Sequence, residues 1–244
     1  MMKLNAKLAV LGAVLAASSS LAFGDTVVAA SYGVPGLGGY TPGTVLTTGN
    51  SAMTYVGFVN YASVSLIPAT PPALGTFTAT GTTAVDLNPL STWNGPLASS
   101  SWVGINANAG PQSTTDPQYG YYEFTTTLTN AITGGTFNLM ADDTTEVLLN
   151  GALFIAQGAL GGDTHCADNK PTCTPVDSVA FSAAAGSTLT FIVEQAGVRG
   201  SGLDPSGVDF NITVPGVPEP NSLMLLGTGL VGAAGMFFRR RVTV

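Results

Sequence analysis

Short segments rich in β-branched and aromatic residues alternate with glycine, proline, asparagine and aspartate between residues 25 and 214. No stretch of a dozen residues in this range has apolar positions spaced three and four apart without a glycine, proline or threonine-rich interruption. This pattern favours strands over helices, because a strand places every second side chain on one face. The expected strands are 53–59, 62–67, 76–79, 102–105, 121–128, 136–141, 146–149, 152–156, 176–182, 188–194 and 208–214.

The clearest local signal is the Asn150-Gly151 pair, which separates the expected strands 146–149 and 152–156. A two-residue type I′ turn needs positive φ at both central positions, and asparagine and glycine adopt it most readily. Many short strands with regular turn residues predict an all-β domain, a β-sandwich or jelly roll, over residues 25–214. About 190 residues are enough for one such domain to bury its own core.

Residues 1–24 have the order of a secretory signal peptide. Lys3 and Lys7 form a short positive region, an apolar run covers 8–17, and small residues follow. We expect a signal helix that signal peptidase removes, with the cut before Asp25 favoured over a cut two residues earlier, because a polar stretch begins there. An uncleaved anchor is disfavoured, since ten apolar residues form a helix of about 15 Å and the hydrocarbon layer is about 30 Å thick.

The C-terminal segment 215–244 combines three features in a fixed order. They are Val217-Pro218-Glu219-Pro220, an uncharged span over 223–238, and the arginines Arg239, Arg240 and Arg241. As a helix the span is about 24 Å long, which is short for a transmembrane helix. The arginines after it favour a cytoplasmic C-terminus by the positive-inside rule. We therefore expect a short transmembrane helix with the preceding domain outside the cell.

This order resembles the PEP-CTERM sorting signal of Gram-negative bacteria that make extracellular polysaccharide. The resemblance implies that a membrane-embedded exosortase recognises the tail during transient insertion in the inner membrane. It also implies processing near Pro218-Glu219-Pro220, followed by release or re-anchoring at the outer cell surface or in the extracellular matrix. The alternative is an ordinary single-span anchor, a role for which a short, glycine-rich span is poorly suited.

The charge of the exported part excludes one large class of function. Between residues 25 and 217, two basic residues, Lys170 and Arg199, stand against thirteen acidic ones, which gives a net charge of −11. A surface of this sign repels phosphate backbones and anionic lipids. We therefore expect no nucleic-acid partner.

Two adjacent carboxylates, Asp142 and Asp143, lie in the expected loop 141–146 between two strands. Neighbouring negative charges repel unless water or a cation shields them, and Ca²⁺ is an ion with the required preference for oxygen. Strand, Asp-Asp, strand and Asn-Gly in this order resemble jelly-roll domains of the protective-antigen type, found in bacterial and yeast adhesins and glycosidases. That resemblance implies that Asp142 and Asp143 bind Ca²⁺, which in turn holds sugar hydroxyls. The alternative is that both aspartates serve a β-turn through their own hydrogen bonds.

Cys166 and Cys173 lie in the expected long loop 157–175, with six residues between them. Two cysteines in an exported chain favour a disulfide, so we expect these two to be bonded. A Zn²⁺ site is disfavoured, because His165 would be only the third ligand and structural sites use four. His165 is also the only histidine, and no Gly-x-Ser-x-Gly turn is present to pair with it in a hydrolase triad.

Together these features favour a non-enzymatic protein of the cell surface or exopolysaccharide matrix, structural or glycan-interacting in role. Its expected partners are signal peptidase, exosortase and extracellular polysaccharide. The alternative is a secreted hydrolase of polysaccharides, with Asp142 or Glu146 paired with Glu194. A glycosidase needs two carboxyl groups about 5 or 9 Å apart, and the sequence leaves that separation open.

Overall fold

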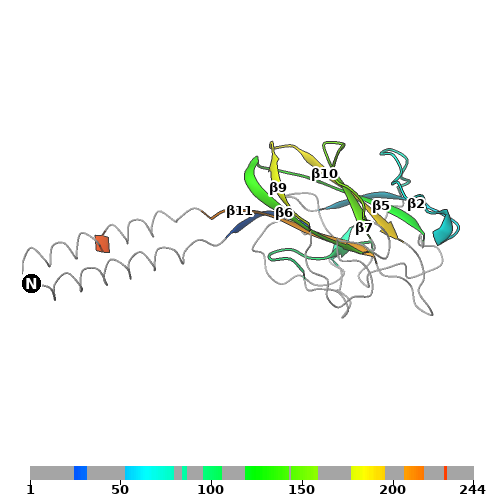
Figure 1. The fold of residues 1–244 in the computed structure, drawn as a ribbon, viewed down its shortest axis with the longest axis horizontal. Coiled ribbons are helices and arrows are strands. Elements are labelled where there is room, and N and C mark those ends of the chain that lie inside the picture. Colours follow the sequence, from blue (N-terminus) through cyan, green and yellow to red (C-terminus); the bar gives the residue numbers. More distant parts are fainter. Residues whose placement is uncertain are drawn as a thin grey trace, which may run out of the picture. The chain divides into compact units, whose positions relative to one another are not determined.

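Figure 1 shows the computed structural model, which describes residues 25–31, 53–79, 84–86, 96–105, 119–142, 144–158, 177–195, 206–216 and 228–229. Val27–Val214 form one compact unit, and Met1–Thr26 with Pro215–Val244 form a second. The expected signal helix and the expected transmembrane helix lie outside the described residues, except that residues 228–229 are described as helical. Among the described residues, no helix has both the length and the hydrophobicity that crossing a membrane requires.

The described residues of the larger unit are mostly β-strands and the turns between them. The strands are β1 (Thr26–Ala30), β2 (Thr54–Asn60), β3 (Val85–Asp86), β4 (Val103–Gly104), β5 (Gly120–Thr127), β6 (Ile132–Asp142), β7 (Thr144–Leu149), β8 (Ala152–Ile155), β9 (Asp177–Ala183), β10 (Thr188–Gln195) and β11 (Gly207–Val214). One short 3-10 helix, η1 (Val64–Leu66), accompanies them in the described part of the chain. The prediction of an all-β domain is confirmed.

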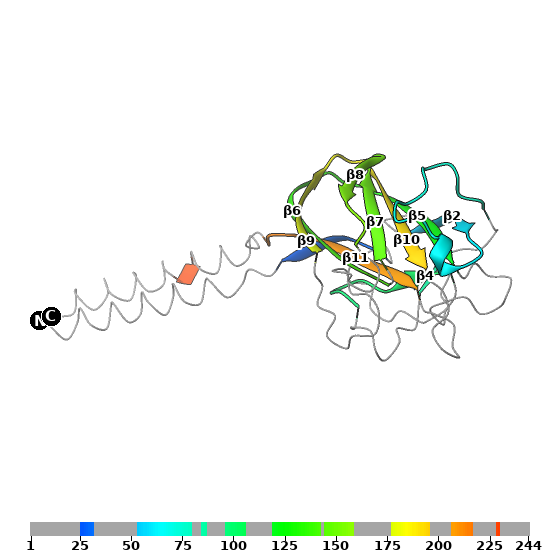
Figure 2. The same cartoon turned by 45° about the vertical axis from the view of Figure 1, so that its right-hand side comes forward.

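These strands form two sheets, which Figures 1 and 2 show from two directions. Sheet A has the order β3-β4-β11-β6-β9, with β1 also paired to β11, and sheet B has the order β2-β5-β10-β7-β8. The strand pairs with a defined register, within the described ranges, are antiparallel. Both sheets contribute residues to one hydrophobic core, as the two layers of a β-sandwich do.

Alternation along the central strands explains how this core forms. Val208, Phe210 and Ile212 of β11 are fully buried in the core, as are Phe191 and Val193 of β10. The rings of Phe191 and Phe210 stack between the two sheets, with their centroids 4.9 Å apart. Because successive side chains of a strand point to opposite faces, the residues between these positions lie on the outer faces of the sheets.

Segments from elsewhere in the chain cover parts of both outer faces. On sheet B, a second cluster of buried side chains packs against residues from segment 61–79; its members are Tyr121, Leu148 and Ile192, with Tyr61, Ile67 and Phe77 against them. Thr78 pairs with Phe58 of β2 through two backbone hydrogen bonds of 2.9 and 3.1 Å. A Cβ atom on Gly57 would lie 2.6 Å from the Thr78 carbonyl oxygen, so this close approach requires glycine.

The hairpin predicted at Asn150-Gly151 is confirmed. Strands β7 and β8 pair in antiparallel fashion around it (Figure 2), and the φ angles of Asn150 and Gly151 are 52° and 78°. The Asn150 side chain also ties the turn to β10, because its Oδ1 accepts a hydrogen bond of 2.9 Å from the Thr188 N–H. The Asn150 N–H also donates to the Thr188 carbonyl oxygen at 2.8 Å and its side-chain amide to the Ser187 hydroxyl at 3.3 Å, so the turn is held by its backbone preference and by three long-range hydrogen bonds.

The first half of the described chain departs from the predicted strands. The strand expected at 62–67 is wrong: Val64–Leu66 form the 3-10 helix, and Leu66 is 59% exposed. The strand expected at 76–79 reduces to the single bridge between Thr78 and Phe58. Pro68, Pro71 and Pro72 lie between these two segments. Proline lacks the N–H that a sheet ladder uses, which explains why the region forms turns instead.

Strand boundaries also differ where pairing partners are distant in sequence. Strands β1 and β3 were not expected, and β4 covers only Val103–Gly104 of the strand expected at 102–105. Strand β6 begins four residues earlier than expected, at Ile132, because the register shifts between Ile132 and Gly135 and lets the pairing with β9 continue. Gly134, within that irregularity, has a φ of 64°, which glycine accommodates without strain.

Candidate functional site

Asp142 lies at the point where the chain passes from one sheet to the other. It is the last residue of β6 in sheet A, where it pairs with Gly207 of β11. Thr144 then begins β7 in sheet B and pairs with Glu194 of β10. The prediction of a loop over 141–146 is therefore wrong, because β6 extends to Asp142 and β7 begins at Thr144. Backbone pairing to two different sheets fixes this corner.

The Ca²⁺ prediction for Asp142 and Asp143 remains a prediction. The Asp142 side chain is buried, with 2% of its surface exposed, while residue 143 lies outside the described residues. Within the described ranges, no group of three or more His, Cys, Asp or Glu side chains is arranged to hold a metal ion. A cation at this corner would therefore need Asp143 or another residue beyond the described ranges.

A polar network lies on the outer face of sheet B. The Gln157 side-chain amide donates to Glu194 Oε2 and, at 3.3 Å, to the Tyr121 hydroxyl. The Tyr121 hydroxyl donates in turn to the Pro68 carbonyl oxygen at 2.6 Å, which fixes segment 61–79 over this face. Burial raises the pKa of Tyr121 well above its usual value, and the neighbouring Glu194 carboxylate adds to the rise. Tyr121 is therefore a hydrogen-bond donor at all physiological pH values.

Two further glutamates share this face with Glu194. Ile192 of β10 pairs with Glu123 of β5 on one side and with Glu146 of β7 on the other. Glu123 is 6% exposed, and its Oε2 atom has no hydrogen-bond partner in the described part of the protein. Burial raises the pKa of both Glu123 and Glu146. These carboxyls therefore favour the neutral form more than solvated glutamates do.

The backbone spacing of these glutamates bears on the hydrolase alternative. Glu123 and Glu146 are separated by two strand spacings, about 10 Å between Cα atoms, and Glu194 is the diagonal neighbour of both. Glycosidases are defined by the separation of the two carboxyl groups, about 5 or 9 Å, which the Cα spacing does not give. However, Glu123 and Glu194 are both buried, and Glu194 is held by Gln157. Both side chains are therefore largely closed to solvent.

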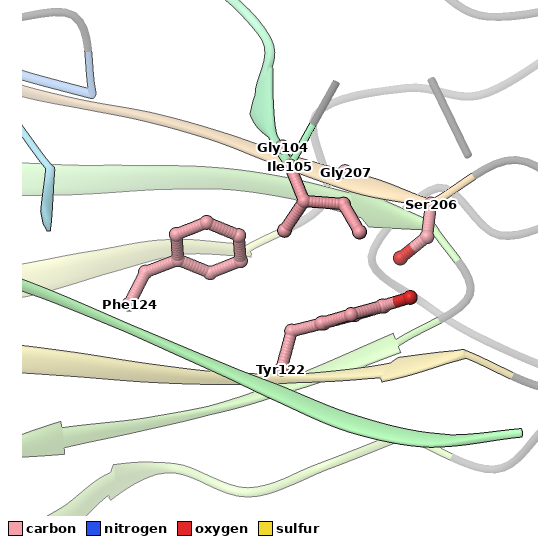
Figure 3. Close-up of a pocket in the computed structure, with 6 residues that line it drawn as sticks. All are labelled: Gly104, Ile105, Tyr122, Phe124, Ser206 and Gly207. Carbon is pink, nitrogen blue, oxygen red and sulfur yellow. The ribbon is translucent and has the colours of Figure 1, made fainter. Parts of the chain in front are cut away.

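A small pocket lies between the sheets at one end of the sandwich (Figure 3). Gly104, Ile105, Tyr122, Phe124, Ser206 and Gly207 line it. Its cavity volume is about 10 Å³, which is room for one water molecule at most. The pocket is therefore a packing defect of the core and too small for a sugar.

Several residues predicted to carry function lie outside the described residues. These are the cysteines Cys166 and Cys173, the processing motif Val217-Pro218-Glu219-Pro220, and the arginines Arg239, Arg240 and Arg241. The disulfide and the cleavage position remain predictions.

The sandwich ends directly before the sorting segment. Strand β11 ends at Val214, and Pro215 and Gly216 are the last described residues before the Pro-Glu-Pro sequence. Residues 216–241 match the family model described as PEP-CTERM protein-sorting motif. No curated protein matches the chain. The motif marks an exported protein that an exosortase sorts toward the cell surface, and the domain that it sorts is all-β.

Sequence reasoning missed three buried carboxyls, Asp86, Glu123 and Asp209. The last two each stand between two core residues of a strand: Glu123 between Tyr122 and Phe124, and Asp209 between Val208 and Phe210. Alternation alone predicts a solvent-facing side chain at such a position. Only the covering segments bury them, and these come from distant parts of the chain without a signal of their own.

Proposed function

We propose that this protein is a non-enzymatic component of the outer cell surface or exopolysaccharide matrix, with a structural or glycan-interacting role. The observation that carries the proposal is the sorting motif at 216–241, which follows β11 after a single residue. In this proposal the sandwich is the delivered cargo. The tail serves only for transport and is removed or exchanged at the membrane.

The arrangement of the chain's ends supports processing at both sides of the sandwich. Strand β1 begins at Thr26, so a signal-peptidase cut before Asp25 leaves one residue ahead of the first strand. An exosortase cut near Pro218-Glu219-Pro220 leaves only a few residues after Val214. Both cuts spare every named strand of the sandwich. The mature protein therefore keeps the core that Val27–Val214 build.

The character of the buried carboxyls supports a non-enzymatic role. Glu194 is hydrogen-bonded to Gln157 and buried, and Glu123 is buried as well. A hydrolase needs two carboxyl groups that reach the same glycosidic bond from solvent. The hydrolase alternative rests on the shared sheet face of Glu146 and Glu194, and burial of Glu194 weighs against it.

Two measurements on the exported protein test this proposal. We expect protein from an exosortase-containing host to fractionate with the cell surface and to sediment with the host's own exopolysaccharide. An isogenic host without exosortase should retain the chain in the inner membrane. Release of reducing ends from that polysaccharide, lost in both Glu146→Gln and Glu194→Gln, would instead establish the hydrolase.

A further inference from the structure

Asp209 lies on the outer face of sheet A and is completely buried. Its neighbours Val208 and Phe210 point into the core, so its own side chain lies on the opposite side of β11. Residues 96–101, which we call the strap, lie against it. The Leu97 N–H donates to Asp209 Oδ2 at 2.8 Å, and Asn211 of the same strand donates to the Ala98 carbonyl oxygen at 2.8 Å. The strap is therefore fastened to β11 by polar contacts.

Two serine hydroxyls complete the fastening. Ser31, which follows β1, approaches Asp209 Oδ1 at 2.9 Å and Ser100 Oγ at 2.7 Å, and it also contacts the Ser101 carbonyl oxygen. Ser100 Oγ contacts Asp209 Oδ1 as well, and it lies 2.7 Å from the Phe210 carbonyl oxygen. Five oxygen–oxygen contacts at hydrogen-bond distance thus meet in a buried space.

The hydrogens available in this cluster are fewer than its contacts. Carbonyl and carboxylate oxygens bring none, and the hydroxyls of Ser31 and Ser100 supply one each, so an ionised Asp209 leaves at most two of the five contacts as hydrogen bonds. A proton on Asp209 allows a third hydrogen bond and also removes a buried negative charge.

No positive charge compensates an ionised Asp209 within the described ranges, which contain no Lys, Arg or His. The titratable groups that face it are acidic. Asp86 of β3 is buried and accepts a hydrogen bond from Ser101 of the strap, and Asp142 lies on the neighbouring strand β6. Strand β4 and the strap contribute no titratable side chain. Among the residues that the structure describes, an ionised Asp209 would therefore face only other carboxyls.

The pKa of Asp209 agrees with this count of hydrogens and charges. Burial raises it to about 6, repulsion from Asp86 adds to the rise, and the hydrogen bonds from Ser100, Leu97 and Ser31 partly offset it. The usual value for an aspartate is about 3.9. Because the folded-state pKa is the higher one, the stabilisation is complete below about pH 4 and is lost as the pH rises through about 6.

We infer that Asp209 holds a proton in the folded protein in mildly acidic surroundings and that the strap is a pH-sensitive clasp on the outer face of sheet A. In mildly acidic surroundings the clasp is closed. At neutral and alkaline pH, loss of the proton leaves a negative charge in the cluster, and the strap loosens from β11. Loosening frees the Asn211 amide, which is the first member of a side-chain ladder through Asn138 of β6 to Ser178 of β9.

The substitution Asp209→Asn separates the two protonation states. An asparagine amide has two N–H groups for the oxygens of Ser31 and Ser100, whose hydroxyls then donate to the Ser101 and Phe210 carbonyls, while its oxygen accepts from Leu97. We expect hydrogen-exchange protection of the Leu97 amide in the exported wild-type protein to fall about a hundredfold between pH 4 and pH 8, which corresponds to a two-unit shift in pKa. In Asp209→Asn the protection should stay constant, and at pH 8 it should exceed the wild-type value.

Two further variants keep the test decisive. Asp86→Asn removes the facing charge, so the midpoint of the wild-type pH transition should move to lower pH. Glu146→Gln removes a carboxyl of sheet B, so it should leave the pH dependence of the Leu97 amide protection unchanged. The inference is overturned if Asp209→Asn loses protection at pH 5, because Asp209 would then act as an ionised acceptor. It is also overturned if Ca²⁺ or chelator alters protection in the wild type but not in Asp209→Asn, because a metal ion would then replace the missing hydrogens.

Discussion

The sorting tail depends on a short contiguous sequence, whereas the sandwich depends on contacts between residues far apart in the chain. In the tail, three short features follow one another within residues 216–241, and their order alone identifies the motif. In the sandwich, the contacts that matter join residues far apart in sequence, such as Ser31 with Asp209 and Pro68 with Tyr121. A change in the tail should therefore alter where the protein goes without altering its stability, and a change in the sandwich should do the reverse.

The largest effect is expected from the combined substitution of Pro218, Glu219 and Pro220 by alanine. Proline keeps a chain extended and out of helices, which suits protease recognition, so its loss should abolish processing and surface delivery. The free energy of unfolding of the sandwich should change by less than about 0.5 kcal/mol, because the named strands and the core residues all precede Pro218 in the chain. Surface fractionation and thermal melting measure the two effects. Normal surface delivery of this variant would contradict the view that the tail determines where the protein goes.

The converse change is Phe137→Ala in the core. Phe137 is fully buried, and its ring stacks on Phe210 with 5.5 Å between centroids and on Phe191 with 6.3 Å. Truncating a buried phenylalanine costs about 3–5 kcal/mol of unfolding free energy. Leu153→Ala is the matched control, because Leu153 is 62% exposed and should cost little. Denaturant titration compares the two variants, and equal midpoints would contradict the shared core.

An intermediate effect is expected from the acidic pair at the sheet crossover. If Asp142 and Asp143 bind Ca²⁺, a hundredfold excess of the ion over its Kd stabilises the wild-type protein by about 2.7 kcal/mol. Replacing both residues by asparagine should remove that stabilisation, and Glu146→Gln should retain it. The melting temperatures of the wild type and the two variants, each measured with Ca²⁺ and with chelator, test this prediction. A wild-type melting temperature that is the same in both would leave the pair as ordinary corner residues.

A smaller and more local effect is expected from the cysteines. A disulfide between Cys166 and Cys173 closes a short ring, for which loop entropy gives about 2.5 kcal/mol, mostly restraining its own loop. Under non-reducing conditions the intact mass should be two hydrogens lower than that of the reduced protein. Serine at both positions should loosen the loop and leave the sandwich folded. Two free thiols in exported protein would contradict the bond.

Local sequence signals predict part of this structure, and long-range contacts determine the rest. The all-β class, the turn at Asn150-Gly151 and the strands β5, β10 and β11 are readable because their signals are local alternation and turn chemistry. The short strand β3 was not predicted, because it forms only by pairing with β4. The 3-10 helix near Leu66 was mistaken for a strand although the prolines that follow it disfavour a sheet ladder.

The buried chemistry of the sandwich was the least predictable part. Asp209 has the sequence context of an exposed strand residue, and only the strap and Ser31 make its site. Glu194 was considered as a catalytic carboxyl, yet Gln157 holds it in a closed network. Burial by distant segments is a tertiary property, which alternation along a single strand does not report.

We expect the tail to direct the protein to the surface and to be removed after delivery. The intact mass of protein extracted from the surface of an exosortase-containing host tests it most directly. We predict a chain that begins near Asp25 and ends between residues 217 and 221, without Arg239, Arg240 and Arg241. A mass that still includes residues 239–244 in such a host would contradict the claim, and the tail would then be a plain membrane anchor.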